Sequence, residues 1–350
     1  MTENRRVRIA DIAEELGVST ATVSNVIHGK TGKMSDETVK RVQKLLEEKQ
    51  YIPSMAGILL AQNDSKIIGV VVNDHEKYEF RVLEDGFVAS SLNALSTELE
   101  KTGYFMMVKV TKNWNEIAKF ASMWNMEGMV VIGFCEQDYK NLREKMHIPF
   151  VIYDGYLTEH GKMCNLIIDN YDGGFQMGRY LRGLGHRKAL CISDNCVCMD
   201  KQRYEGFRDA MPKYGADFLQ IPMEQQERLD FYQRNLEKLR GYSAIFAVSD
   251  YYAIELMQFL IRNGIRIPRD ISVAGFDDSR MCEMVYPALT TVRQDGARRA
   301  KLAVRMLQEL KQGHTVETEQ LLPVSLVRRQ SVSPVAEICQ SIEIFGGPKT

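Results

Sequence analysis

The chain of 350 residues lacks the features that would place it in a membrane or outside the cell. No segment approaches the roughly 18 consecutive apolar residues that a membrane-spanning helix needs. The polar residues 1–8 lead directly into an amphipathic pattern, so they do not resemble a secretory signal. The 7 cysteines are odd in number and lack the spacing of a disulfide framework, which favours a reducing compartment. We therefore expect a cytoplasmic protein with no membrane partner.

The chain also lacks an excess of charge of either sign. Lys and Arg total 45 and Asp and Glu total 46, which excludes a protein that coats nucleic acid through bulk positive charge. Even the first fifty residues hold only nine basic residues against eight acidic ones. Any DNA binding should therefore depend on individually placed contacts, and non-specific binding should be weak at physiological salt.

Signatures of enzymes and metal sites are missing too. There is no Gly-x-Ser-x-Gly elbow, no His-Glu-x-x-His, and Gly29-Lys30-Thr31 lacks the first glycine and the strand of a P-loop. Cys191, Cys196 and Cys198 cluster without a nearby histidine or second cysteine pair, so we expect no metal and no cofactor. His186 follows a predicted helix, where a cation stabilises the helix dipole, and we interpret it as a capping residue.

What is present begins with three short helices. Apolar residues recur at helical spacing within residues 9–46, in three segments. The first segment stops at Gly17, and Ser19 and Ser35 are suited to cap the second and third helices. Gly17-Val18-Ser19 is the short turn that a helix-turn-helix requires, although a plain helical hairpin would show the same pattern.

From Ile67 onward, apolar strands alternate with amphipathic helices. The predicted strands are 67–73, 105–110, 129–134, 150–153, 189–193, 244–247 and 271–275. The predicted helices are 89–101, 115–125, 174–184, 203–211, 230–239, 252–263 and 298–312. This alternation predicts parallel, doubly wound sheets, and its length favours two α/β lobes with a ligand at the carboxyl ends of the strands.

Several motifs resemble, in order and spacing, the lactose/galactose-repressor family of bacterial transcription regulators. In the first part these are Ile9-Ala10-Asp11-Ile12-Ala13, Gly17-Val18-Ser19-Thr20-Ala21-Thr22-Val23-Ser24, Ser35-x-Glu37-Thr38 and Tyr51-Ile52-Pro53. In the second they are Asp169-Asn170-Tyr171-Asp172-Gly173-Gly174, Leu184-Gly185-His186-Arg187, Arg203-x-Glu205-Gly206-Phe207, Ile267-Pro268-x-Asp270-Ile271-Ser272-Val273-x-Gly275-Phe276-Asp277-Asp278 and Pro287-x-Leu289-Thr290-Thr291-Val292. The resemblance covers roughly residues 7–330.

The resemblance implies an N-terminal all-α helix-turn-helix head, residues 1–53, and a hinge helix, residues 54–65. It further implies an α/β core of two lobes, residues 66–333, that is periplasmic-binding-protein-like, followed by a tail, residues 334–350. The expected lobes are about 66–166 with 295–322, and about 167–293 with 323–333. The resemblance also implies a homodimer that binds a near-palindromic DNA operator.

The resemblance assigns DNA contacts to the second helix and the hinge. Base contacts fall on Thr20, Ala21 and Asn25, phosphate contacts on Ser19, Thr22, Ser24 and His28, and minor-groove contacts on Leu60 and Leu59. Asn25 can pair bidentately with adenine, but many relatives carry arginine there, so the usual operator sequence is in doubt. Gly57 stands where the hinge commonly has alanine, which weakens the hinge helix by about 1 kcal/mol.

The resemblance also implies that a small effector binds between the lobes. The matching residues are Asn73, Asp74, Phe87, Asp154, Arg203, Ser249, Asp250 and Asp277. Arg203 beside carboxylates suits a hydroxyl-rich or anionic ligand, such as a sugar or related polar metabolite. Helix capping remains an alternative role for Asp250 and Asp277. The segment between Gly69 and Gly103 is longer than is typical, which weakens the assignment of Phe87.

We therefore expect a ligand-responsive, sequence-specific DNA-binding transcription regulator that is not an enzyme, and a repressor in particular. Two alternatives stay open at this point. One is a sensor that binds a solute or a protein co-effector and has altered DNA binding. The other is an enzyme built on a two-lobed scaffold.

Overall fold

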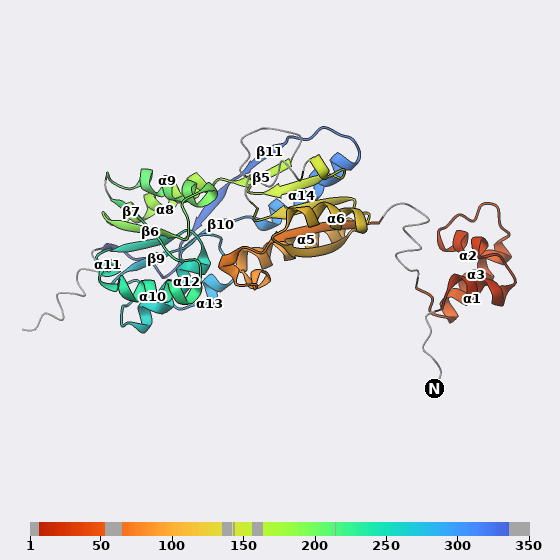
Figure 1. Cartoon of the computed structure of the whole chain (residues 1–350), viewed down its shortest axis with the longest axis horizontal. Coiled ribbons are helices and arrows are strands. Elements are labelled where there is room, and N and C mark those ends of the chain that lie inside the picture. Colours follow the sequence, from red (N-terminus) through yellow and green to blue (C-terminus); the bar gives the residue numbers. More distant parts are fainter. Residues whose placement is uncertain are drawn as a thin grey trace, which may run out of the picture. The chain divides into compact units, whose positions relative to one another are not determined.

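The computed structural model describes residues 7–52, 65–134, 142, 144–155, 164–213 and 215–335. Contacts between Cα atoms divide the chain into two units, residues 1–65 and residues 66–350, which we call the head and the core (Figure 1). Leu59 and Leu60 of the predicted hinge lie outside the described residues, as does most of the tail. Among the described residues, no helix is both long and apolar enough to span a bilayer.

The head consists of α1 (Ile9–Leu16), α2 (Thr20–Ile27) and α3 (Asp36–Glu48). Gly17 ends α1 in the left-handed conformation at φ 68°, which glycine adopts without steric cost. As predicted, Ser19 and Ser35 accept hydrogen bonds from backbone amides of α2 and α3. The three helices bury a common apolar core, made of Ile12, Ala13, Val23, Val26, Val42 and Leu45.

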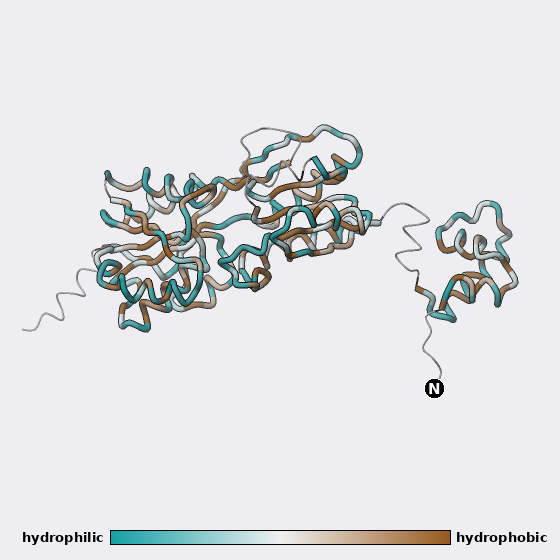
Figure 2. The backbone as a smooth tube through the Cα atoms, viewed as in Figure 1, coloured by the Kyte–Doolittle hydropathy of each residue, from teal (hydrophilic) through white to brown (hydrophobic). Residues whose placement is uncertain are grey.

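The first lobe of the core contains a parallel six-stranded sheet in the order β11-β5-β4-β3-β1-β2. Its strands are β1 (Ile67–Asn73), β2 (Phe105–Thr111), β3 (Gly128–Ile132), β4 (Phe150–Tyr153), β5 (Cys164–Ile168) and β11 (Glu319–Leu322). The apolar strands appear as a brown centre between more polar helices in Figure 2. Strand order reverses at β1, which lies between β2 and β3.

Helices cover both faces of this sheet. Helices α5 (Gly86–Lys101) and α14 (Gly296–Lys311) pack on one face, against Val70 and its neighbours on alternate positions of β1. Helix α6 (Trp114–Met123) packs on the other face, against Val71. Full burial of each such aliphatic side chain contributes about 1.5–3 kcal/mol, so the near-continuous apolar sequence of β1 requires both layers.

The second lobe contains a parallel four-stranded sheet in the order β7-β6-β8-β9. Its strands are β6 (Ala189–Ser193), β7 (Ala216–Gln220), β8 (Ala244–Ala247) and β9 (Ser272–Ala274). Helices α8 (Asn170–Gly183) and α9 (Cys198–Ala210) lie on one side of the sheet, and α12 (Asp250–Arg262) lies on the other (Figure 1). The short helix α13 (Met281–Met284) follows β9.

The predictions for the second lobe are wrong in two respects. The single helix predicted over residues 230–239 is interrupted at Asn235, giving α10 (Gln225–Arg234) and α11 (Leu236–Arg240). Strand β7 was not predicted, and neither were β5, β11, β10 (Thr291–Gln294) or β12 (Val324–Val327). Strands β10 and β12 form an antiparallel pair, and β12 follows β11 of the first lobe after a single residue.

Helices α8 and α9 approach each other so closely that backbone touches backbone. A Cβ atom built at Gly174 would lie 1.9 Å from the carbonyl oxygen of Arg203, and one built at Gly206 would lie 1.9 Å from that of Tyr171. Only glycine fits at either position, because a backbone atom cannot rotate away as a flexible side chain can. This close contact fixes the position of Arg203 on α9 of the second lobe.

We predict that Gly174→Ala destabilises the core by about 3 kcal/mol, because the added methyl group must separate two packed helices. Equilibrium unfolding in urea measures the effect. Gly183→Ala is the matched control on the same helix, where no atom lies within 4 Å of the added Cβ. Equal stability of the two variants would contradict the close contact.

Candidate functional site

The predicted DNA-contacting residues lie together on the surface of α2 in the head. Thr20, Ala21 and Asn25 are exposed, whereas Val23 and Val26 on the opposite side are buried. The hydroxyl group of Ser19 accepts from the Thr22 amide at 3.1 Å and lies 2.9 Å from the Thr22 hydroxyl. Ser24 and His28 are half-buried on the same helix and its C-terminal cap. The face is therefore small, polar and preorganised, as a helix in the major groove requires.

The core holds a cavity of about 140 Å³ to which both lobes contribute. It lies where strand order reverses in each sheet, at the carboxyl ends of β1, β3 and β4 in the first lobe and of β6 and β8 in the second. This is the position at which parallel α/β sheets bind ligands. Of the predicted effector residues, the cavity is lined by Asn73, Phe87, Asp154, Arg203, Ser249 and Asp277.

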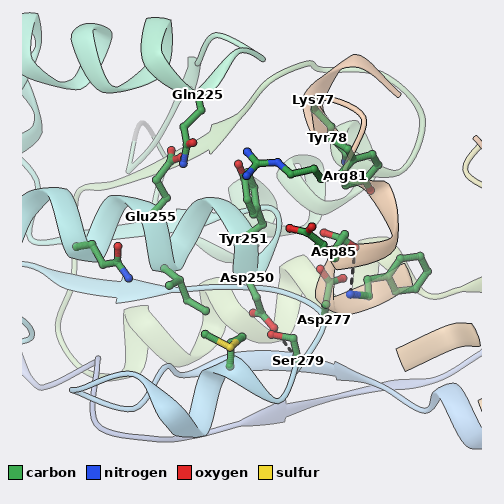
Figure 3. Close-up of a pocket in the computed structure, with 16 residues that line it drawn as sticks. Lys77, Tyr78, Arg81, Asp85, Gln225, Asp250, Tyr251, Glu255, Asp277 and Ser279 are labelled. Atoms are coloured by element: carbon green, nitrogen blue, oxygen red, sulfur yellow. Dashed lines mark hydrogen bonds between the residues drawn. The ribbon is translucent and has the colours of Figure 1, made fainter. Parts of the chain in front are cut away.

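A larger cavity of about 330 Å³ adjoins the first, and the two share lining residues such as Lys77, Tyr78 and Asp277. The segment after β1, residues 74–85, forms one wall with two short 3-10 turns, η1 (Glu76–Tyr78) and η2 (Val82–Glu84). Figure 3 shows Lys77, Tyr78 and Arg81 from this wall opposite Tyr251 of α12. The segment between Gly69 and Gly103, which is longer than is typical of the family, therefore forms part of the site.

Contacts across the larger cavity join the two lobes. Glu79 Oε1 accepts from the backbone amide of Gln225, at the N-terminus of α10, at 2.9 Å. The favourable charge interaction at a helix N-terminus strengthens this contact. Gly86 approaches Ser279 closely enough that an added Cβ would lie 2.8 Å from its Cβ. The segment after β1 and the first residue of α5 therefore each touch the second lobe.

Two predicted effector residues are held by the protein itself. Asp154 forms an ion pair with Arg299 at 2.8 Å, and both side chains are at most 5% exposed. Asp250 accepts from the Ser279 amide at 2.7 Å and from the Thr291 hydroxyl at 2.6 Å. Burial raises the pKa of Asp250 to about 6. Asp250 lines only the larger cavity, and Asp74 is not among the residues that line either.

Neither Asp250 nor Asp277 is the N-cap of a described helix, and the residue before Asp250 caps α12 instead. Ser249 is the N-cap of α12 and accepts from the Tyr252 amide at 3.4 Å. Asp277 caps no helix: its Oδ1 accepts from the Gln294 side chain at 2.6 Å and lies 3.8 Å from Arg203 Nη1. Burial raises the pKa of Asp277 well above its usual range, and Arg203 partly offsets this. Asp277 therefore remains positioned to meet a ligand in either cavity.

Arg203 is almost completely buried at the back of the smaller cavity. Its Nε donates to Asn170 at 2.8 Å and its Nη1 donates to the carbonyl oxygen of Val248 at 2.6 Å. Its guanidinium carbon lies 3.8 Å from the centre of the Phe276 ring. These contacts fix the plane of the guanidinium group, so its remaining N–H donors have a fixed direction relative to a ligand in the cavity.

Four buried polar atoms of residues that line the smaller cavity have no hydrogen-bond partner in the described part of the chain. They are the hydroxyl oxygens of Tyr153 and Tyr252, Oδ2 of Asp194 and Oε1 of Gln294. Each such atom costs about 1–3 kcal/mol when left unsatisfied. A ligand rich in hydrogen-bonding groups would supply these partners.

Sequence reasoning missed several residues of the site. Asp194 follows the predicted strand 189–193 directly, so its position at a strand end could have indicated it. Lys77 and Asp200 line the cavity, and Arg299 pairs with Asp154, only through tertiary packing, which no local pattern reports. Another prediction is wrong, because His186 is fully buried beside Ser243 and Ser333 and burial lowers its pKa, so it is not a cationic cap.

The cysteine cluster offers no metal centre within the described ranges. No group of three His, Cys, Asp or Glu side chains there has an arrangement that could hold a metal ion. Cys191 is buried in the sheet, whereas Cys196 is exposed, so the two thiols face different surroundings.

Comparisons with known proteins agree with both parts of the structure. Residues 8–54 match the family described as bacterial regulatory proteins, lacI family, and residues 179–332 match the periplasmic binding protein-like domain. The transcriptional repressor PurR of Vibrio atlanticus is 30% identical over 317 residues, which cover 86% of this chain and 91% of that protein.

Solved structures show the same fold. The lac repressor dimer bound to operator and the anti-inducer ONPF has a TM-score of 0.79 at 23% identity, covering 94% of this chain and 100% of that one. The CelR-cellobiose complex has a TM-score of 0.66 at 21% identity, covering 93% and 100%. The predicted fold class and the predicted family are both confirmed. The chain belongs to the lacI family of bacterial regulatory proteins.

Proposed function

We propose that this protein is a cytoplasmic repressor that binds a near-palindromic DNA operator as a homodimer and responds to a small polar effector. The observation that carries the proposal is that one chain combines an exposed polar recognition helix with an interlobe cavity whose buried polar atoms lack partners. The homologous PurR is named as a transcriptional repressor, which supports the regulatory role.

The recognition helix supplies base contacts through Thr20, Ala21 and Asn25, which are the exposed residues at its N-terminal turn and on its outer face. Ser19, Thr22, Ser24 and His28 would hold phosphates, which position the helix without reading sequence. Because the head carries almost no net charge, affinity would come from these contacts and from dimerisation. Leu59 and Leu60 remain a prediction for the minor groove, where an apolar wedge kinks the duplex.

A two-fold dimer explains how a head of three short helices would reach useful affinity. One recognition helix reads one half-site, so two heads related by symmetry read a near-palindrome. The lac repressor structure with a similar fold is described as a dimer on its operator, which supports this arrangement. The effector would bind between the lobes and shift operator affinity by its difference in affinity for the two states.

The effector would be polar and rich in hydrogen-bonding groups. Tyr153, Asp194, Tyr252 and Gln294 each have a buried atom without a partner, and Arg203 lies with them around one cavity. The similar CelR structure contains cellobiose, which supports a sugar-like ligand.

We predict that Asn25→Ala weakens specific operator binding about 10-fold and relaxes preference at one operator position, since one bidentate base contact contributes about 1–3 kcal/mol. Gel shifts against palindromes from the protein's own promoter region, at physiological salt, measure this. Gln43→Ala, an exposed substitution on α3, is the control and should bind normally. If no palindrome outcompetes bulk DNA for the unmodified protein, the regulator function fails.

We predict that Tyr153→Phe raises the melting temperature of the ligand-free protein slightly, because it deletes a buried hydroxyl group that has no partner. The same variant should weaken binding of any sugar or nucleoside that stabilises the unmodified protein in a thermal-shift panel. Tyr232→Phe is the matched control, since its hydroxyl is also buried and unpartnered but lines neither cavity. Equal ligand affinity in both variants would place the effector elsewhere.

A further inference from the structure

Acidic side chains outnumber basic ones around the smaller cavity among the described residues. Its carboxylates are Asp85, Asp154, Asp194, Asp200 and Asp277, and its permanent cations are Lys77 and Arg203. The ion pair with Arg299 neutralises Asp154, which leaves four acidic side chains beside two cations. Burial raises the pKa of three of them, Asp85, Asp200 and Asp277, which shows that their charged forms lack full compensation. His75 also lines the cavity, but burial and the neighbouring Lys77 lower its pKa, so it adds no charge at neutral pH.

The acidic side chains come from both lobes, and those of Asp194 and Asp200 are buried. Asp85 is the N-cap of α5 in the first lobe, and only its Oδ1 is used by the amides of Phe87 and Val88. Asp194 is 1% exposed and Asp200 is 9% exposed, both in the second lobe. Oδ2 of Asp194 makes no hydrogen bond of good geometry, although the Tyr252 hydroxyl group interacts with this carboxylate. A buried carboxylate oxygen without a well-formed hydrogen bond therefore lies at the cavity.

The two cations cannot neutralise all of these groups. Arg203 is committed to Asn170, to the carbonyl oxygen of Val248 and, at 3.8 Å, to Asp277. Lys77 lies 5.0 Å from the centre of the Tyr78 ring and is attracted to Asp194 and Asp200 across the cleft. Burial raises the pKa of Asp277, and the nearby carboxyl groups of Asp250 in the same lobe and Asp85 in the other lobe raise it further.

The chemistry of the ligand follows from this imbalance. An anion would add to the repulsion, and a neutral sugar would supply hydrogen bonds but leave the buried charges uncompensated. An ammonium group supplies both a positive charge and three hydrogen-bond donors. Its hydrogen bonds to carboxylates are charge-assisted and roughly twice as strong as those between neutral groups.

We propose that the effector is a small polar amine, whose ammonium group binds the carboxylates of Asp194 and its neighbours between the lobes. The proposal rests on the function proposed above, because it names the ligand class for the same cavity. It narrows the expectation from the sequence, in which Arg203 suited a hydroxyl-rich or an anionic ligand. Amino sugars and short aliphatic amines share this chemistry, and the experiment separates them.

The test measures binding to the full-length protein by calorimetry and thermal shift, with cationic, neutral and anionic ligands of related chemistry. D-glucosamine is compared with D-glucose, N-acetyl-D-glucosamine and D-gluconate, and putrescine with its diol analogue butanediol. We expect an amine to bind at least about 10-fold more tightly than its neutral partner, the factor for one charge-assisted hydrogen bond. Gluconate should not bind.

Two substitutions of opposite sign test the residues. Asp194→Asn should weaken amine binding about 10-fold and leave the affinity of neutral ligands unchanged. Lys77→Met should strengthen amine binding, because it increases the excess of negative charge. Glu237→Gln, at a side chain that is 83% exposed on α11, is the control. The two opposite effects cannot both result from a general loss of folding.

The outcomes separate this inference from the proposed function. If a neutral ligand or gluconate binds more tightly than the amines and changes operator binding, the regulator function stands and the amine proposal is overturned. If no amine binds to protein that binds operator specifically, the amine proposal is again overturned. If glucosamine binds and putrescine does not, the ligand is an amino sugar, and the reverse result assigns an aliphatic amine.

Discussion

Parallel strands in both lobes end at the same cleft, and this constraint determines most of the site. Side chains that follow β1, β4, β6 and β8 reach the cavity between the sheets because carboxyl ends of parallel strands share one edge. Many of these residues are polar, so closing the lobes buries charge. The buried pair of Arg299 and Asp154 shows one solution, in which α14 supplies the missing cation at the end of β4.

The same constraint explains why the second lobe is so tightly built around Arg203. The glycine contact between α8 and α9 sets the position of the Arg203 backbone. Contacts with Asn170, Val248 and Phe276 then fix the Arg203 guanidinium group. A flexible arginine would neutralise whichever carboxylate was nearest. A fixed one offsets only part of the burial of Asp200, whose pKa stays raised.

Much of the fold could be predicted from the sequence, because buried parallel strands are continuous apolar runs. Segments 67–73, 150–153, 189–193 and 244–247 are strands with the predicted bounds. By contrast, β7 and β11 are only partly buried and carry polar residues, so their pairing with a neighbour, not their composition, makes them strands. In the site, Arg203 and Asp277 were predicted by family resemblance, but Lys77 comes from a loop whose path is set by packing.

Ligand and DNA would bind to different units of the chain. The change in operator affinity therefore cannot exceed the difference in ligand affinity between the two states of the protein. A tenfold change in operator affinity requires the effector to discriminate between two states of the protein by about 1.4 kcal/mol. Relief of one unpaired buried carboxylate is of that size. If the amine binds only one arrangement of the lobes, compensation of the Asp194 charge alone would produce a measurable change in operator affinity. The change would be detectable because the head has almost no net charge with which to bind DNA non-specifically.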